Sequence, residues 1–134
     1  MSHGETVAAR ARALVGTRFR PQGRQREHGL DCVGLVALAA NLPAELVPTG
    51  YRLRSTVTEN LLSATFEDRV KPISPMEAAQ GDVLLVGSSA GQNHFLILTD
   101  RGFVHADARV GRVVETPGTI PWPMIAAWRI RELD

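Results

Sequence analysis

The hydrophobic pattern of this chain changes at about residue 82, and that change constrains the fold more than any other feature. Before it, Val7, Ala11, Leu14 and Val15 are spaced as the buried face of a helix, which predicts a helix over residues 5–15. After it, short β-rich runs alternate with turn residues, and these runs span residues 83–86, 94–99, 102–105, 112–115 and 126–131. Helices followed by consecutive strands predict an α+β fold, with N-terminal helices packed on a central antiparallel β-sheet.

Between the first helix and the strands, the residue types predict further short elements. Residues 17–30 contain proline, glycine and several arginines and predict a loop. A nearly all-apolar stretch then predicts a buried helix over residues 32–42. An alternating run at residues 51–54 predicts a short exposed strand, and a capping box predicts a helix over residues 56–66. Serine and proline at positions 74 and 75 predict a brief helix that ends by Gly81.

Length and composition are those of an ordinary soluble globular domain. The 134 residues fit a single domain spanning residues 1–134; 44% are hydrophobic and 22% are charged. A net charge of +1 and the lack of interleaved aromatic residues argue against nucleic-acid binding. No apolar run approaches the roughly 18 residues of a membrane helix, and the N-terminus lacks the layout of a secretory signal. We therefore expect synthesis in the cytoplasm and no insertion into a membrane.

Cys32 is the only cysteine, so it can form neither an internal disulfide nor a four-thiolate metal site. It is a small core residue, a surface thiol or a nucleophile. Asp31 begins the apolar helix, which puts Cys32 in the first turn, where unpaired N–H groups and the helix dipole favour a thiolate. We therefore expect a reactive thiol with a lowered pKa. Gly34 in the same helix predicts a close approach between the helix and the sheet.

The histidines supply a general base for such a thiol. His94 opens one β-rich run and His105 closes the next, so a hairpin around residues 99–102 would make them cross-strand neighbours at one end of the sheet. A nucleophilic thiol needs a base of this kind and a group that orients the base. His28 lies in the loop just before Cys32, and His3 lies in the N-terminal tail. Taken one at a time, each histidine also fits an ordinary polar position at a strand end or in a loop.

Four segments together resemble the NlpC-type cell-wall cysteine peptidases, which have a compact papain-like fold. These segments are residues 14–20 with the following Gly23-Arg24, the Asp31-Cys32 motif in residues 29–35, residues 81–85, and residues 94–98 with 103–106. The resemblance covers residues 5–131. The first of these segments, Val33 and the closing residues 127–129 look most like the subgroup associated with tails of phages and prophage-like elements.

The resemblance implies a role for each matching residue. Cys32 would be the nucleophile, His94 the general base, and His105 the residue that orients His94. Asp31, Phe19, Arg24 and His28 are the candidates for the oxyanion and substrate side of the site. The implied activity is hydrolysis of peptidoglycan stem peptides, at the amide bond between D-glutamate and a diamino acid. The implied partners are the stem peptide and proteins of a phage-like particle acting at the cell wall.

Several alternatives stay open at this point. Many family members carry tyrosine where this chain has Phe19, which has no hydroxyl to donate, so a side-chain role near the oxyanion is in doubt there. A structural tail-assembly protein without activity, or a thiol amidase or acyltransferase on the same fold, would share these motifs. The four arginines of residues 18–26 form either a solvated loop or contacts with substrate carboxylates. Because the chain lacks paired-ligand spacing, we expect no zinc site formed by Cys32, His94 and His105, and no other metal or cofactor.

Overall fold

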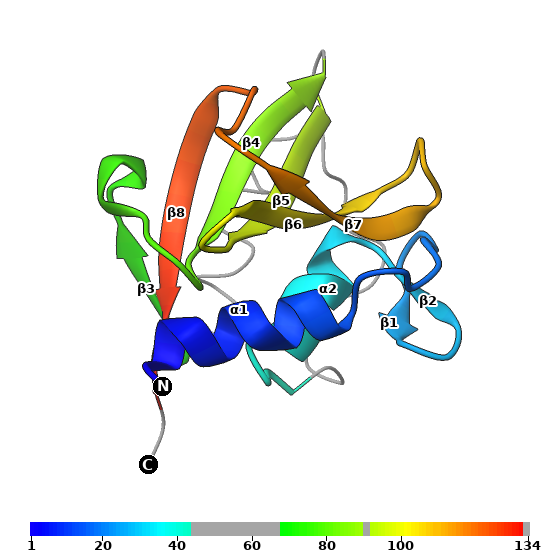
Figure 1. The fold of residues 1–134 in the computed structure, drawn as a ribbon, viewed down its shortest axis with the longest axis horizontal. Coiled ribbons are helices and arrows are strands. Elements are labelled where there is room, and N and C mark those ends of the chain that lie inside the picture. Colours follow the sequence, from blue (N-terminus) through cyan, green and yellow to red (C-terminus); the bar gives the residue numbers. More distant parts are fainter. Residues whose placement is uncertain (44–67, 90–91, 133–134) are drawn as a thin grey trace.

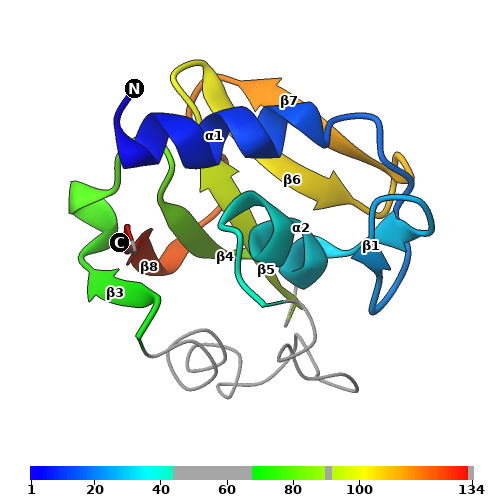
Figure 2. The same cartoon turned by 90° about the horizontal axis from the view of Figure 1, so that it is seen from below.

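A computed structural model describes residues 1–43, 68–89 and 92–132 of the chain. Two α-helices, α1 (His3–Ala13) and α2 (Cys32–Ala39), lie on one side of a six-stranded sheet, as Figures 1 and 2 show. The sheet contains β3 (Val70–Ile73), β4 (Val83–Ser89), β5 (Gln92–Leu98), β6 (Gly102–Asp107), β7 (Arg112–Pro117) and β8 (Met124–Ile130). The expected α+β fold, with helices packed on an antiparallel sheet, is confirmed.

The strands follow the order β3-β8-β4-β5-β6-β7, and every neighbouring pair is antiparallel. Consecutive strands β4 to β7 are therefore neighbours in space, while β8 returns to pair with β4 on its other edge. The pairing of β5 with β6 is short, because it joins only Ile97 to Val104 and Leu98 to Phe103. Upstream of Ile97 no further pair joins the two strands among the described residues, and the candidate site lies where this pairing ends.

The two faces of the sheet are buried differently. Alternate residues of β4, β5 and β6 belong to the main core, which also contains the buried faces of α1 and α2. The residues between them, among them Leu84, Leu96 and Phe103, form a smaller cluster on the opposite face. The connection from β7 to β8 covers this second face with Ile120 and Trp122. The sheet is thus covered on both sides, by helices on one and by this connection on the other.

The first helix differs from its predicted bounds by two residues at each end. The Ser2 hydroxyl caps α1 by accepting a hydrogen bond from the N–H of Glu5. The Glu5 carboxylate accepts in turn from the N–H of Ser2, which completes a capping box. His3 is therefore the first residue of a helix and not part of a free tail. Because α1 ends at Ala13, Val15 falls outside the helix and is 44% exposed.

The remaining differences concern short elements. The predicted loop contains a small hairpin made of β1 (Arg24–Gln25) and β2 (Gly29–Leu30), and α2 ends at Ala39 instead of residue 42. The brief helix after Ser74 is a single 3₁₀ turn, η2 (Pro75–Glu77), and β3 was not predicted. The predicted strand at 51–54 and helix at 56–66 lie outside the described residues.

Gly34 makes its close contact with a different partner from the one predicted. A Cβ atom there would collide with the carbonyl oxygen of Gly23, just before β1, and would also press on the Leu30 side chain. The element that approaches α2 so closely is the β1–β2 hairpin and not the sheet. This contact fixes the first turn of α2, which carries Cys32, against the hairpin.

Candidate active site

The side chains of His94 on β5 and His105 on β6 are in direct contact, just beyond the end of the pairing between these strands. Nε2 of His94 lies 2.9 Å from Nδ1 of His105, so one of these nitrogens donates a hydrogen bond to the other. The two rings are nearly perpendicular, with centroids 5.1 Å apart. In the register that pairs Ile97 with Val104, the residue opposite His105 is Leu96 and not His94. The two histidines are therefore diagonal neighbours across the strands and not a directly opposed pair.

Burial keeps both histidines neutral at physiological pH. Desolvation, followed by the proximity of His105, lowers the pKa of His94 to about 4. Desolvation also lowers the pKa of His105, while the charge of Asp107 acts weakly in the opposite direction on both residues. A neutral imidazole can accept a proton, so at neutral pH His94 is in the protonation state that a general base requires. Nδ1 of His94 has no hydrogen-bond partner among the described residues, so it is the ring nitrogen left to accept that proton.

Cys32 is the first residue of α2, directly after the helix cap. Asp31 caps the helix by accepting a hydrogen bond of 2.9 Å from the N–H of Gly34, as the sequence predicts. The thiol belongs to the main core and is only 2% exposed. The backbone N–H groups of Cys32, Val33 and Phe95 interact with the sulfur and favour its ionised form. Since Phe95 directly follows His94, the sulfur lies against the backbone that carries the base.

The expectation of a lowered thiol pKa is wrong for this structure. Burial, with a further contribution from the negative charge of Asp31, raises the pKa of Cys32 to about 12. The three N–H groups oppose this shift but are outweighed. No hydrogen bond joins the thiol to His94 among the residues that the structure describes. The resting state is therefore a protonated thiol near a neutral imidazole, and not a thiolate–imidazolium pair.

The candidates for the substrate side occupy the segments next to α2. Besides capping the helix, Asp31 accepts a hydrogen bond from the N–H of Gln22, and its carboxylate lies 3.6 Å from the guanidinium of Arg24. Asp31 and Arg24 thus hold the hairpin against α2. Phe19 is half-buried against the main core and pairs with Leu30. His28 lies at the exposed turn of the β1–β2 hairpin. The structure therefore brings Asp31 and Arg24 together beside Cys32 and leaves His28 at the surface.

Two residues near the histidines were missed by sequence reasoning. Trp122 packs its indole against both imidazoles, and Asp107 is close enough to affect the pKa of each. Asp107 follows His105 by two residues, so the alternation of a strand could have indicated it. Nothing in the local pattern around Trp122 indicates a contact with residues 17 and 28 positions earlier, because that contact depends on the path between β7 and β8.

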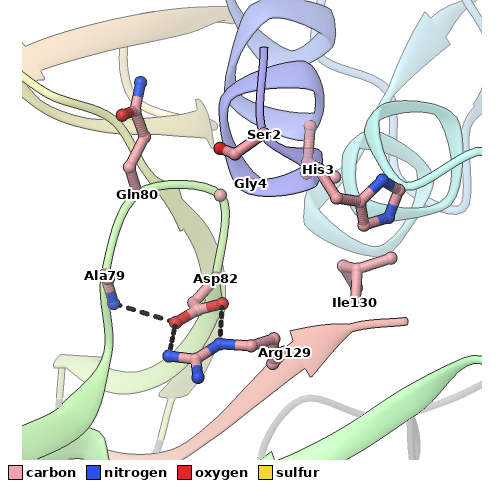
Figure 3. Close-up of a pocket in the computed structure, with 10 residues that line it drawn as sticks. Ser2, His3, Gly4, Ala79, Gln80, Asp82, Arg129 and Ile130 are labelled. Carbon is pink, nitrogen blue, oxygen red and sulfur yellow. Dashed lines mark hydrogen bonds and ion pairs between the residues drawn. The ribbon is translucent and has the colours of Figure 1, made fainter. Parts of the chain in front are cut away.

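A separate pocket of about 230 Å³ lies at the start of α1, lined by His3, Asp82, Arg129 and their neighbours (Figure 3). Asp82 accepts two hydrogen bonds from the Arg129 guanidinium and one from the N–H of Ala79. None of the proposed catalytic residues lines this pocket. Among the described residues, no group of three or more His, Cys, Asp or Glu side chains could hold a metal ion. None of the described helices is long and apolar enough to cross a membrane.

Comparison with known proteins gives structural similarity without close sequence similarity. No family model matches the chain, and no curated protein matches it. NlpC2 from Trichomonas vaginalis superposes with a TM-score of 0.69 at 17% identity, over 97% of this chain and 47% of that one. The peptidoglycan hydrolase RipB from Mycobacterium tuberculosis gives a TM-score of 0.62 at 23% identity, over 98% of this chain and 66% of that one. The NlpC/p60 domain of the peptidoglycan hydrolase SagA gives a TM-score of 0.58 at 26% identity, over 92% of this chain and 96% of that one.

These similarities identify the fold. The two helices and the six-stranded antiparallel sheet have the arrangement of the NlpC/P60 structures, as the sequence motifs predict. The chain spans about half the length of the Trichomonas protein and nearly the whole of the SagA domain.

Proposed function

We propose that this protein is a cysteine peptidase that hydrolyses peptidoglycan, with Cys32 as nucleophile, His94 as general base and His105 as the residue that orients His94. The observation that supports this most strongly is the 2.9 Å contact between the two imidazoles, together with the interaction of the Cys32 sulfur with the N–H of Phe95, the residue after His94. We assign the roles of nucleophile, base and orienting group, which thiol catalysis needs, to these three residues from distant parts of the sequence.

The proposed reaction is acyl transfer. The Cys32 sulfur attacks the carbonyl carbon of the scissile amide while the thiol proton passes to Nδ1 of His94. The C–N bond then breaks, and the same proton goes from His94 to the leaving amine, which leaves a thioester on Cys32. Water attacks the thioester with His94 again accepting a proton, and the acid product and free thiol are released. The N–H groups around the sulfur are placed to stabilise the oxyanion.

The protonation states of the resting site suit a concerted form of this reaction. Since the pKa of Cys32 is raised to about 12 and that of His94 is lowered to about 4, the proton stays on sulfur until attack begins. In this respect the site resembles a serine–histidine pair, in which a neutral nucleophile transfers its proton during attack. His94 must then donate from Nε2 to His105, so that Nδ1 is free to accept.

The substrate that we propose is the peptidoglycan stem peptide, cut between D-glutamate and the diamino acid. The support is the resemblance of the cysteine and histidine motifs to the NlpC-type peptidases, together with the peptidoglycan hydrolases among the similar structures. Stem peptides carry carboxylates, and the arginines of residues 18–26 next to α2 are suited to bind them. Arg18, Arg20 and Arg26 are exposed, whereas Arg24 is turned toward Asp31.

For the biological setting we propose a phage-like particle that carries the protein, made in the cytoplasm, to the cell wall. The support comes from the sequence alone, in the segment of residues 14–20, in Val33 and in the closing residues 127–129. Mass spectrometry of purified particles from the source strain tests it. The protein should co-purify with tail proteins, and its absence from every particle fraction would contradict this setting.

One observation favours a second candidate function. A thiol that is 2% exposed and held in its protonated form is also what a catalytically idle structural protein would contain. Such a protein would fold and assemble equally well with alanine at position 32.

Digestion of purified muropeptides, with products identified by mass spectrometry, separates the two functions. The wild-type protein should release peptides with a new amino terminus on the diamino acid, and Cys32→Ala should release none while keeping its fold. Met76→Ala, at a side chain that is 86% exposed in η2, is the control and should cleave at the wild-type rate. Failure of the folded, reduced wild-type protein to cleave any muropeptide between pH 5 and 9 would refute the peptidase proposal.

A further inference from the structure

Trp122 contacts both members of the histidine pair. Its ring centroid lies 6.2 Å from that of His94 and 5.6 Å from that of His105, with interplanar angles of 84° and 64°. It also packs edge-on against Phe103, at 5.7 Å. No other tryptophan, tyrosine or phenylalanine has a ring contact with both imidazoles in the part of the chain that the structure describes.

The sheet itself fixes the position of this indole relative to His94. Val86 of β4 pairs with His94 on one side and with Met124 of β8 on the other, so these residues form one row across three strands. Trp122 precedes Met124 by two residues, and the carbonyl of the intervening Pro123 accepts a hydrogen bond of 3.1 Å from the N–H of Gly87. The backbone on either side of Trp122 is therefore held against the same row of strand residues that includes His94.

The flanking sequence restricts this segment further. Trp122 lies between Pro121 and Pro123, and each proline fixes its own φ and disfavours helical geometry in the residue before it. The segment therefore loses little conformational freedom when it docks on the sheet. An exposed apolar side chain needs no such restraint, whereas a side chain that must hold two rings in place benefits from it.

We propose that Trp122 is a positioning residue of the active site: its indole holds the two imidazoles in their hydrogen-bonded arrangement and excludes water from the face of the sheet opposite α2. This inference rests on the proposed function for its catalytic consequence, although the effect on the histidines does not depend on it. Trp122 touches neither the thiol nor any reacting atom, and it would act through His94 and His105.

The electrostatic surroundings agree with this role. Desolvation is the largest cause of the lowered pKa of both histidines, and Trp122 is one of the groups that covers them. Among the described residues, the one carboxylate that affects the pair is Asp107 on β6, and it raises both pKa values slightly. Strand β4 and the connection over residues 118–123 contain no charged residue. Removal of the indole should therefore let water reach the pair and raise its pKa values.

NMR titration of the histidine side chains in the substrate-free protein tests this proposal directly. Trp122→Ala should raise the pKa of His94 by at least about one unit toward the ordinary value near 6.5. Trp122→Phe, which keeps an aromatic ring, should titrate close to wild type. Ile120→Ala is the matched control, because Ile120 covers the same face from the same connection and has no ring contact with either histidine. It should lower stability without changing the titration.

Kinetics on muropeptides supply the catalytic readout. Trp122→Ala should lower kcat on the order of 10–100-fold with little change in KM, and Trp122→Phe should restore most of it. If the wild-type protein cleaves nothing, the proposed function fails, but the titration still decides the role of Trp122. If Trp122→Ala does not fold, Trp122→Leu keeps apolar volume without a ring and should show the same rise in pKa. Unchanged histidine titration in a folded Trp122→Ala or Trp122→Leu protein would overturn the proposal.

Discussion

Nε2 of His94 lies 2.9 Å from Nδ1 of His105, although the strands that carry them pair directly at only two positions. The contact lies just beyond the end of the pairing between β5 and β6, and it uses one nitrogen of each ring. For His94 this leaves Nδ1 without a partner among the described residues, next to the backbone segment that meets the Cys32 sulfur.

Replacement of His105 tests its role in orienting the base. His105→Ala removes the acceptor for Nε2 of His94 and should lower kcat about 10²-fold, within the range lost when a general base is misplaced. His105→Asn places an amide oxygen near the position of Nδ1 and should recover most of that loss. Steady-state kinetics on a muropeptide measure both effects, with the exposed-site variant Met76→Ala as the control. Equal activity of wild type and His105→Ala would show that His105 has no part in the reaction.

Acidification should destabilise the folded protein through His94. The unfolded chain binds a proton at this residue near pH 6.5, whereas the folded protein binds it only near its lowered pKa of about 4. Between these values the unfolded state binds more protons, so the free energy of unfolding should fall by about 3 kcal/mol between pH 7 and pH 4 on account of this group. Urea unfolding at both pH values measures the difference.

The matched variant for this measurement is His94→Gln, which cannot titrate. Its loss of stability on acidification should be smaller than that of wild type by roughly the same 3 kcal/mol. His28→Gln, at the exposed turn, should behave as wild type does. A wild-type and a His94→Gln protein that lose the same stability between pH 7 and pH 4 would show that His94 is not buried in its neutral form.

Asp31 should make the thiol less reactive while it caps the helix. Asp31→Asn keeps a side-chain oxygen for the N–H of Gly34 but removes the charge that raises the pKa of Cys32. The pH profile for alkylation of Cys32 by iodoacetamide should therefore shift to lower pH in this variant. In wild type the rate should still be rising above pH 9. Glu27→Gln, in the exposed turn, is the charge-matched control, and an identical profile for all three proteins would argue against any influence of Asp31.

Gly34 should be intolerant of any side chain. A Cβ atom there would meet the Gly23 carbonyl oxygen, so Gly34→Ala should lower the free energy of unfolding by about 1–3 kcal/mol even though alanine favours a helix. At Gly87 a Cβ atom would meet only the Ile125 side chain, at 3.9 Å, so Gly87→Ala is the control and should cost less. Chemical denaturation of both variants measures this, and a fully stable Gly34→Ala protein would mean that the hairpin can move away from α2.

The sequence predicted α1 and the long strands because their burial follows simple periods, and α2 because a nearly all-apolar run follows a capping residue. Asp31 caps α2 as its residue type indicates, and the alternation in β4 to β6 separates the two faces of the sheet. The first helix was displaced by two residues because the capping box of Ser2 and Glu5 was not recognised. Strand β3 was not predicted because it has only four residues and one of them is proline. It is a strand because its backbone pairs with β8, which its own sequence does not indicate.

For the site, the motifs pointed to the three proposed catalytic residues but not to their electrostatics. A helix terminus favours a thiolate, yet near-complete burial of Cys32 and the adjacent carboxylate of Asp31 outweigh it. Burial at this level is a property of the packed core and cannot be read from the first turn of a helix. The contact of Trp122 with both histidines depends in the same way on the register of three strands.

If Cys32 is the nucleophile that we propose, it forms a thioester with the substrate. The intact mass of the protein, quenched in acid during turnover of a muropeptide, measures this most directly. The wild-type protein should gain the mass of the acyl fragment, and digestion should locate that mass on Cys32. Cys32→Ala should gain nothing, while His105→Ala should accumulate the adduct more slowly. Turnover by the wild-type protein without any adduct, together with undiminished cleavage by Cys32→Ala, would contradict the account.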